Sequence, residues 1–444
     1  LLLDNSGESD WALSVKNTGD KPRSVITEFP RIDGVQLGAP DSRNLQTVMR
    51  QGGYVDDAWK DPGDVYGRWS MQWYSIFDPI SNSALGLVVE DPNVLNKRFV
   101  LLKPTIAVRY FPPRVIQPRG SIILPRAKVL VCRGDYKSTA RAYSRWYEKA
   151  LRPVKPPQWF AECDGISGYH FKKKSPVVKA DYPGQFVLES FRDLPAAHMG
   201  VPFNHSEYAF WSRGSMLYGK HTDGDNFFRE DMSGAEAMRD AVAGLHKLGM
   251  YTTFYIEGYI VYKDSELAKE GKARRWSVMN YDGGISGNYT SQGFYHMCPG
   301  CVEWQDHLAS VVRRVLRETG ADGIRLDSLG FYFLPCYNPE HHHASPFGYN
   351  EWVQQLLSKV RKAALEVNRD AVLTTESPVD FFGRWFHGAL TQVYPRDIPP
   401  MRLALRNYRP VAYTSAGAIW SSISGVAGAG DCWESDVETL AYRW

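Results

Sequence analysis

The sequence changes character at a proline-rich segment, VKPPQW (154–159). Before this segment, short runs rich in β-branched residues are separated by Pro, Gly, Asp and Asn, which is typical of strands and turns. The first helical pattern is YKSTARAYSRWYEKAL (136–151). Consecutive prolines continue neither a helix nor a sheet, so the segment is expected to be a linker. We therefore predict two domains, residues 1–152 and 153–444, and an antiparallel β-sandwich as the first of them.

The second part of the chain alternates strand and helix patterns. The helix expected at 233–249 begins with a capping-box pattern of Ser233 and Glu236 and ends at Gly249. Further helices are expected at 303–320 and 349–368, and strands at 207–214, 250–258, 321–330, 371–378 and 386–395. Such alternation implies parallel strands joined by right-handed crossovers. Its length, and the absence of a glycine-rich nucleotide fingerprint, favour an α/β fold of the (β/α)8 TIM-barrel type.

Composition excludes several classes of partner. The chain has 444 residues and a formal net charge of only +3, which gives no electrostatic reason to bind nucleic acid or an anionic membrane. No apolar run is long enough to span a bilayer. The chain begins inside an expected strand and ends inside an expected helix, so we expect a trimmed chain, truncated at its C-terminus. A leader removed in this way slightly favours a secreted or periplasmic location over a cytoplasmic one.

Cysteine and histidine patterns do not predict a metal centre. The six cysteines are too few and too scattered for a disulfide framework, and only Cys298 and Cys301 form a CxxC pair. A single CxxC does not by itself indicate zinc. The run His341–His343 lies in the loop after an expected strand, where it could contact substrate, form a solvated cluster or, less favoured, hold a metal. We expect no metal and no cofactor.

The strand expected at 321–330, ADGIRLDSLG, carries two charged residues on one face. Arg325 and Asp327 have the same parity, whereas Ile324 and Leu326 take the other face. In a barrel, alternate residues point into the lumen, and the carboxyl ends of the strands carry the chemistry. The arginine would keep the buried aspartate ionised. The alternative is an internal salt bridge with a purely structural role.

Neighbouring strands repeat this theme of polar or aromatic residues at their ends. Glu376 ends one expected strand and Glu257 another, and both are acidic. The candidates for substrate contact are Trp211, Arg213, Glu257, Arg325, His343, Tyr394 and Asp397. Together with 14 Trp, 25 Tyr and 20 Phe, which suit the stacking of sugar rings as well as core packing, they indicate an oligosaccharide or polysaccharide substrate.

Two carboxylates on adjacent strands are the groups that glycoside hydrolysis requires. One acts as an ionised nucleophile, and the other protonates the leaving group and later activates water. Asp327, beside Arg325, suits the first role, because a nearby cation favours the ionised form. Glu376, in the more neutral sequence TTES, suits the second role.

The segment GIRLD, with Asp327 at the end of the fourth expected barrel strand, resembles the retaining α-glycosidases of the α-amylase-like and α-galactosidase-like glycoside hydrolase superfamily. The resemblance implies that Asp327 is the nucleophile and that Arg325 orients it. Glu376 matches the strand-five acid/base of the amylase-like branch, and Asp397 would match the strand-six acid/base of the α-galactosidase branch. The order of sandwich, YSRWYEKALRPVKPPQW and barrel resembles α-galactosidase-like and endo-α-N-acetylgalactosaminidase-like enzymes, and an uncharacterised glycosyl-hydrolase-like domain family of this type.

Two other functions fit the same residues. A carbohydrate-binding barrel without hydrolytic activity would use the carboxylates only to accept hydrogen bonds. A metal-dependent hydrolase would use the three histidines or the CxxC pair. Carboxylate spacing separates the first alternative from a glycosidase, and elemental analysis separates the second.

Overall fold

The computed structural model describes residues 7–42, 44–47, 54–55, 65–162, 166–167, 204–208, 224–228, 234–287, 290–327, 329, 333–376, 379–391 and 409–412. The chain divides into two compact units. The first comprises Leu1–Pro153, Ser377–Arg384 and Arg396–Pro410, and the second comprises Val154–Glu376, Trp385–Pro395 and Val411–Trp444. The sequence prediction placed one division at 152/153 and assigned everything later to the barrel. In the structure the described residues Asp380–Arg384 also group with the first unit.

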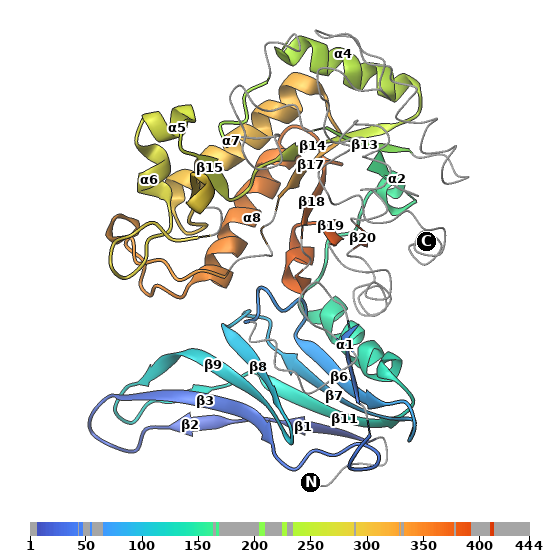
Figure 1. Ribbon diagram of the computed structural model, residues 1–444, viewed down its shortest axis with the longest axis vertical. Coiled ribbons are helices and arrows are strands. Elements are labelled where there is room, and N and C mark those ends of the chain that lie inside the picture. The colour runs from blue at the N-terminus through green and yellow to red at the C-terminus, as the bar shows by residue number, and fades with distance from the viewer. Residues whose placement is uncertain are drawn as a thin grey trace. The chain divides into compact units, whose positions relative to one another are not determined.

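The first unit consists of antiparallel sheets and one long helix (Figure 1). Six strands pair in the order β1-β11-β7-β6-β4-β5, three in the order β3-β9-β8, and β10 pairs with β2. The strands are β1 (Glu8–Trp11), β2 (Ser14–Lys16), β3 (Arg23–Ile32), β4 (Leu45–Thr47), β5 (Tyr54–Val55), β6 (Trp73–Asp78), β7 (Ser83–Glu90), β8 (Lys97–Leu102), β9 (Thr105–Ile116), β10 (Ser121–Ile123) and β11 (Arg126–Arg133).

Helix α1 (Tyr136–Ala150) packs on strands β6 and β7. The Asp135 side chain caps its first turn by accepting a hydrogen bond from the backbone N–H of Lys137 at 2.9 Å. Thr139 and Tyr143, one helical turn apart, lie on its buried face. The indole N–H of Trp73 donates to the Thr139 hydroxyl at 3.2 Å, and the rings of Trp73 and Tyr143 stack. The helix therefore covers an aromatic layer of the sheet.

A buried polar network lies inside the first unit. The Lys97 ammonium donates to Asp91 Oδ2 at 2.7 Å, to Gln72 Oε1 at 2.8 Å and to the Leu95 carbonyl at 2.9 Å. Asp380, in the 3-10 helix η4 (Asp380–Arg384), accepts hydrogen bonds from the hydroxyls of Tyr66 and Tyr143 and from the Gln72 N–H. The three N–H groups of the lysine all have partners, as a buried cation requires.

The second unit is built on a parallel sheet with the order β12-β13-β14-β17-β18-β19-β20. Its strands are β12 (Ile166–Ser167), β13 (His205–Tyr208), β14 (Tyr251–Ile256), β17 (Gly323–Leu326), β18 (Val372–Glu376), β19 (Gly388–Thr391) and β20 (Arg409–Ala412). Each strand of the sheet pairs with the next one along the chain, as in successive βα units. Within the described ranges no pairing joins β12 to β20, so closure into an eight-stranded barrel stays a prediction.

Helices alternate with the strands of this sheet along the chain. The main ones are α4 (Gly234–Lys247), α7 (Val302–Thr319) and α8 (Tyr349–Leu365), with α7 in contact with both of the others (Figure 1). Helix α7 ends at Gly320, whose φ of 72° lies in the left-handed region that glycine tolerates. These three helices confirm the predicted ones to within a few residues at each end. Strand β13 begins two residues before the predicted strand 207–214, most of which lies outside the described residues.

An excursion between β14 and α7 was not predicted. It contains a small antiparallel hairpin of β15 (Ile260–Tyr262) and β16 (Phe294–His296). The remaining short elements of the unit are α2 (Gln158–Ala161), α5 (Glu266–Lys269), α6 (Lys272–Trp276), η2 (Thr290–Gln292) and η3 (Pro339–His341). No helix in the described part of the chain is long and apolar enough to cross a membrane.

Candidate active site

Three acidic residues share one level at the carboxyl ends of adjacent strands. The pairing of β14 with β17 and of β17 with β18 places Ile256, Leu326 and Thr375 in one row. The next residue on each strand is acidic: Glu257, Asp327 and Glu376. Neighbouring strands lie about 4.8 Å apart, so the register brings the three carboxylates together. We call these three residues the acid row.

All three side chains of the acid row are buried. Glu257 is 0% exposed, Glu376 5% and Asp327 6%. A buried carboxylate is costly unless hydrogen bonds or a cation compensate for the lost water. The residues two positions back on each strand face the same side of the sheet, because side chains alternate along a strand. Two of these residues, Tyr255 and Arg325, provide the compensation.

Asp327 receives two strong hydrogen bonds. Arg325 Nη1 donates to Asp327 Oδ1 at 2.8 Å, and the Tyr255 hydroxyl lies 2.9 Å from Asp327 Oδ2. The Arg325 guanidinium also lies over the Tyr255 ring, 4.6 Å from its centroid. Each oxygen of Asp327 therefore faces a donor, which fixes the orientation of the carboxyl group.

The Tyr255 hydroxyl links Asp327 to Glu257. It lies 2.8 Å from Glu257 Oε2 and 2.9 Å from Asp327 Oδ2, yet a hydroxyl has only one proton to donate. The Tyr255 hydroxyl therefore donates to Glu257 or to Asp327 at any one time. Burial, and then the charges of Asp327 and Glu376, raise the pKa of Glu257 well above its usual range.

The predicted site residues fall into two groups. Glu257, Arg325, Asp327 and Glu376 come together as described above. Trp211, Arg213, Tyr394 and Asp397 lie outside the described residues. Tyr255 was not among the predicted site residues, although it precedes Glu257 by two positions in a strand. The alternation of side chains could have identified it.

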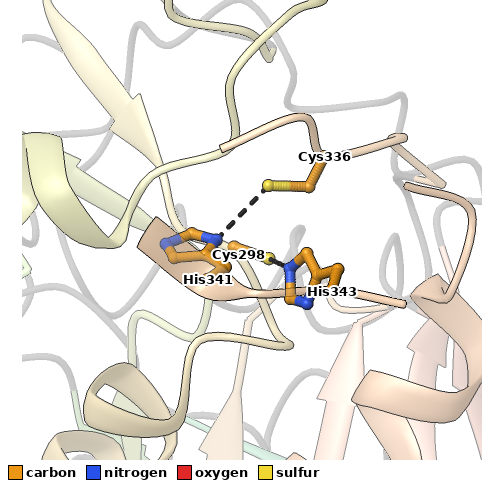
Figure 2. Close-up of side chains that lie close together, drawn as sticks. All are labelled: Cys298, Cys336, His341 and His343. Atoms are coloured by element: carbon orange, nitrogen blue, oxygen red, sulfur yellow. Dashed lines mark hydrogen bonds between the residues drawn. The ribbon is translucent and has the colours of Figure 1, made fainter. Parts of the chain in front are cut away.

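His343 lies beside two cysteines and a tryptophan. Its Nε2 lies 3.3 Å from Cys298 Sγ, and its ring stacks on Trp352 with centroids 3.8 Å apart. Figure 2 shows it with Cys298, Cys336 and His341. Among its described contacts there is none with the acid row. The histidine run and the CxxC pair, treated separately in the sequence, thus meet in the structure.

Comparison with solved structures shows a shared fold. The alpha-N-acetylgalactosaminidase NagBb from Bifidobacterium bifidum, in complex with GalNAc, is 12% identical with a TM-score of 0.59, over 90% of this chain and 76% of that one. The GH36 alpha-galactosidase AgaA from Geobacillus stearothermophilus is 10% identical with a TM-score of 0.53, over 90% and 55%. The alpha-galactosidase from Lactobacillus brevis is 10% identical with a TM-score of 0.55, over 91% and 58%. The chain thus spans little more than half the length of the two alpha-galactosidases.

Comparison of sequences places the chain in a family. No curated protein matches it. The model of a family described as a domain of unknown function, DUF6259, matches residues 125–406. This match covers well over half of the chain and includes the whole acid row. The chain therefore belongs to the DUF6259 family.

Proposed function

We propose that the chain is a retaining α-glycosidase on a (β/α)8 barrel preceded by a β-sandwich. The observation that carries the proposal is the acid row, in which Arg325 and Tyr255 each hydrogen-bond one oxygen of Asp327 beside other carboxyl groups. The fold shared with alpha-galactosidases and an alpha-N-acetylgalactosaminidase supports it. Barrel enzymes carry their chemistry at this end of the strands.

In the proposed mechanism Asp327 attacks the anomeric carbon and forms a glycosyl ester. Glu376 protonates the departing glycosidic oxygen, and the C–O bond to the leaving group breaks. Glu376 then removes a proton from water, which cleaves the ester and releases the sugar with its original configuration. Retaining pairs are separated by about 5–5.5 Å. The spacing of adjacent strands, about 4.8 Å, is compatible with that separation for Asp327 and Glu376.

The other residues have supporting roles in this proposal. Arg325 orients the nucleophile, and the neutral Glu257 holds Tyr255 so that its proton faces Asp327. Trp211, Arg213, Tyr394 and Asp397 are proposed to contact the sugar, and Asp397 is the alternative acid/base. The substrates proposed are α-linked, galacto-configured glycans, in line with the enzymes that share the fold.

Release of the aglycone from a panel of aryl α- and β-glycosides tests this function. We expect wild type to act on α-galactosides or α-N-acetylgalactosaminides and Asp327→Asn to be inactive. Asp306→Asn is the matched control, because Asp306 is exposed on α7 and its pair with Lys359 is a surface interaction. Binding of these sugars without release by wild type would instead support a non-hydrolytic binding protein. Full turnover by Asp327→Asn would reject its role as nucleophile.

A further inference from the structure

Four potential metal ligands converge at one point of the second unit. Cys298 follows β16, His341 closes η3, and Cys336 and His343 flank η3. One ligand atom from each of the four side chains lies within 4.8 Å of the other three. Figure 2 shows the two thiols and the two imidazoles facing a common centre. We call these four residues the Cys/His cluster.

The spacing of the ligand atoms matches a tetrahedral zinc site. Zinc–sulfur bonds of about 2.3 Å and zinc–nitrogen bonds of about 2.0–2.1 Å place sulfur and nitrogen about 3.6 Å apart. Cys298 Sγ lies 3.3 Å from His343 Nε2, and Cys336 Sγ lies 3.4 Å from His341 Nδ1. These two distances are slightly shorter than those in an occupied site.

Neighbouring groups orient the two imidazoles as metal ligands. His341 Nε2 lies 2.9 Å from the Arg275 carbonyl oxygen, which can only accept a hydrogen bond. With the proton on Nε2, the lone pair of Nδ1 faces Cys336, whose Sγ lies 3.4 Å away. A metal-bound histidine typically donates its other N–H to a carbonyl in this way. The ring of His343 is fixed by stacking on Trp352.

The second cysteine of the CxxC pair is not part of the cluster. The Cys301 thiol lies 3.4 Å from Glu303 Oε2, to which it donates a hydrogen bond. Gly300, between the two cysteines, has no room for a side chain. A Cβ there would lie 2.5 Å from His343 Cε1 and 2.6 Å from Trp352 Cδ2. The sequence CPGC thus places one thiol in the cluster and the other beside His341, while leaving space for His343.

We propose that Cys298, Cys336, His341 and His343 bind one Zn²⁺ in a closed structural site. Four protein ligands leave no position open for water or substrate, as in structural rather than catalytic zinc sites. The ion would join the segment that precedes α7 to the loop that follows β17. Since Asp327 comes directly after β17, the ion would also stabilise the loop adjoining the acid row. This role differs from that of a metal-dependent hydrolase.

Metal analysis of the wild-type full chain, without an affinity tag, tests the site directly. After loading with Zn²⁺ and gel filtration we expect one Zn²⁺ per chain. X-ray absorption at the zinc edge should show two sulfurs at about 2.3 Å and two nitrogens at about 2.0–2.1 Å. No retained zinc, or a shell of oxygen and nitrogen alone, would overturn the proposal. A shell of three sulfurs would overturn the ligand set.

Variants locate the site independently. Cys298→Ser and Cys336→Ser should each abolish stoichiometric zinc and the charge-transfer absorption of the Co²⁺-substituted protein. Cys132→Ser, a change to a free cysteine of the first unit, should leave both unchanged. Gly300→Ala should weaken zinc retention about 10–100-fold by displacing His343. Unchanged zinc content in both cluster variants would contradict the proposal. If the variants fail to fold, the X-ray absorption spectrum of the wild-type protein tests the ligand set by itself.

Discussion

The two units each bury charged groups, but these groups differ in how completely their charges and hydrogen bonds are matched. In the first unit Lys97 and Asp91 form a fully buried ion pair, and every N–H of the lysine has an acceptor. In the acid row, Arg325 pairs with Asp327, and two further carboxyl groups lie beside this pair. Glu257 Oε1 is buried and has no hydrogen-bond partner among the described residues. The first arrangement is complete by itself, and the second leaves charge and hydrogen-bonding capacity that a substrate could use.

This contrast separates structural polar groups from functional ones. A buried network with matched donors and acceptors fixes one arrangement of the core and has no capacity left for chemistry. Like charges held together shift one another's pKa, which is how sites obtain one protonated and one ionised carboxyl group. The predictions below test whether the two regions differ as this interpretation requires.

The largest effect is expected from Glu376→Gln. Loss of a general acid lowers the rate by about 10²–10⁴-fold, and the loss should be greatest for substrates with poor leaving groups. Rates on aryl α-glycosides with phenols of different acidity measure it, because an acidic phenol departs without protonation. Glu366→Gln, a change at an exposed residue paired with Arg313, is the control. A loss independent of the leaving group would exclude Glu376 as the acid and leave Asp397 to be tested.

Breaking the ion pair of the first unit should affect stability instead of chemistry. Lys97→Met leaves Asp91 buried without its cation, which costs about 3–5 kcal/mol of unfolding free energy. Denaturant unfolding of the full chain measures the loss, and the exposed Lys137→Met should change it by less than about 0.5 kcal/mol. Adding Asp91→Asn to Lys97→Met should recover part of the loss. Equal stability of wild type and Lys97→Met would show that the pair contributes nothing.

Glu257→Gln should have the smallest effect on rate, because glutamine resembles the protonated acid. Turnover should stay within about 10-fold of wild type at neutral pH. Stability should change with pH. The raised pKa of Glu257 adds stability below the unfolded value of 4.5, and this contribution is lost as pH rises toward the folded pKa.

Denaturant unfolding across the pH range checks the sign of this effect. Wild type should lose stability relative to Glu257→Gln as the pH rises above 4.5. For Glu366→Gln the difference should change below pH 4.5 and with the opposite sign: wild type loses its advantage as the pH falls, because the hydrogen bond from Arg313 lowers the pKa of Glu366. A pH-independent difference between wild type and Glu257→Gln would mean that Glu257 is not held protonated.

Local periodicity predicted much of this arrangement. The parity of Arg325 and Asp327 placed both on one face, and strand order made Glu257 and Glu376 their neighbours. Two features depend on contacts that periodicity does not encode. Cys298 meets the segment 336–343 through loops, and the segment after Glu376 returns to the first unit, where Asp380 accepts hydrogen bonds from two tyrosines. Both result from long-range packing of irregular segments.

The most direct test of the central claim is NMR observation of the first sugar anomer formed from an aryl α-galactoside or α-N-acetylgalactosaminide. Wild type and Asp327→Asn would be followed side by side, before mutarotation mixes the anomers. The proposed mechanism predicts the α anomer from wild type and no release from Asp327→Asn. Formation of the β anomer first, or equal release by the variant, would contradict the assignment of Asp327 as the nucleophile of a retaining enzyme.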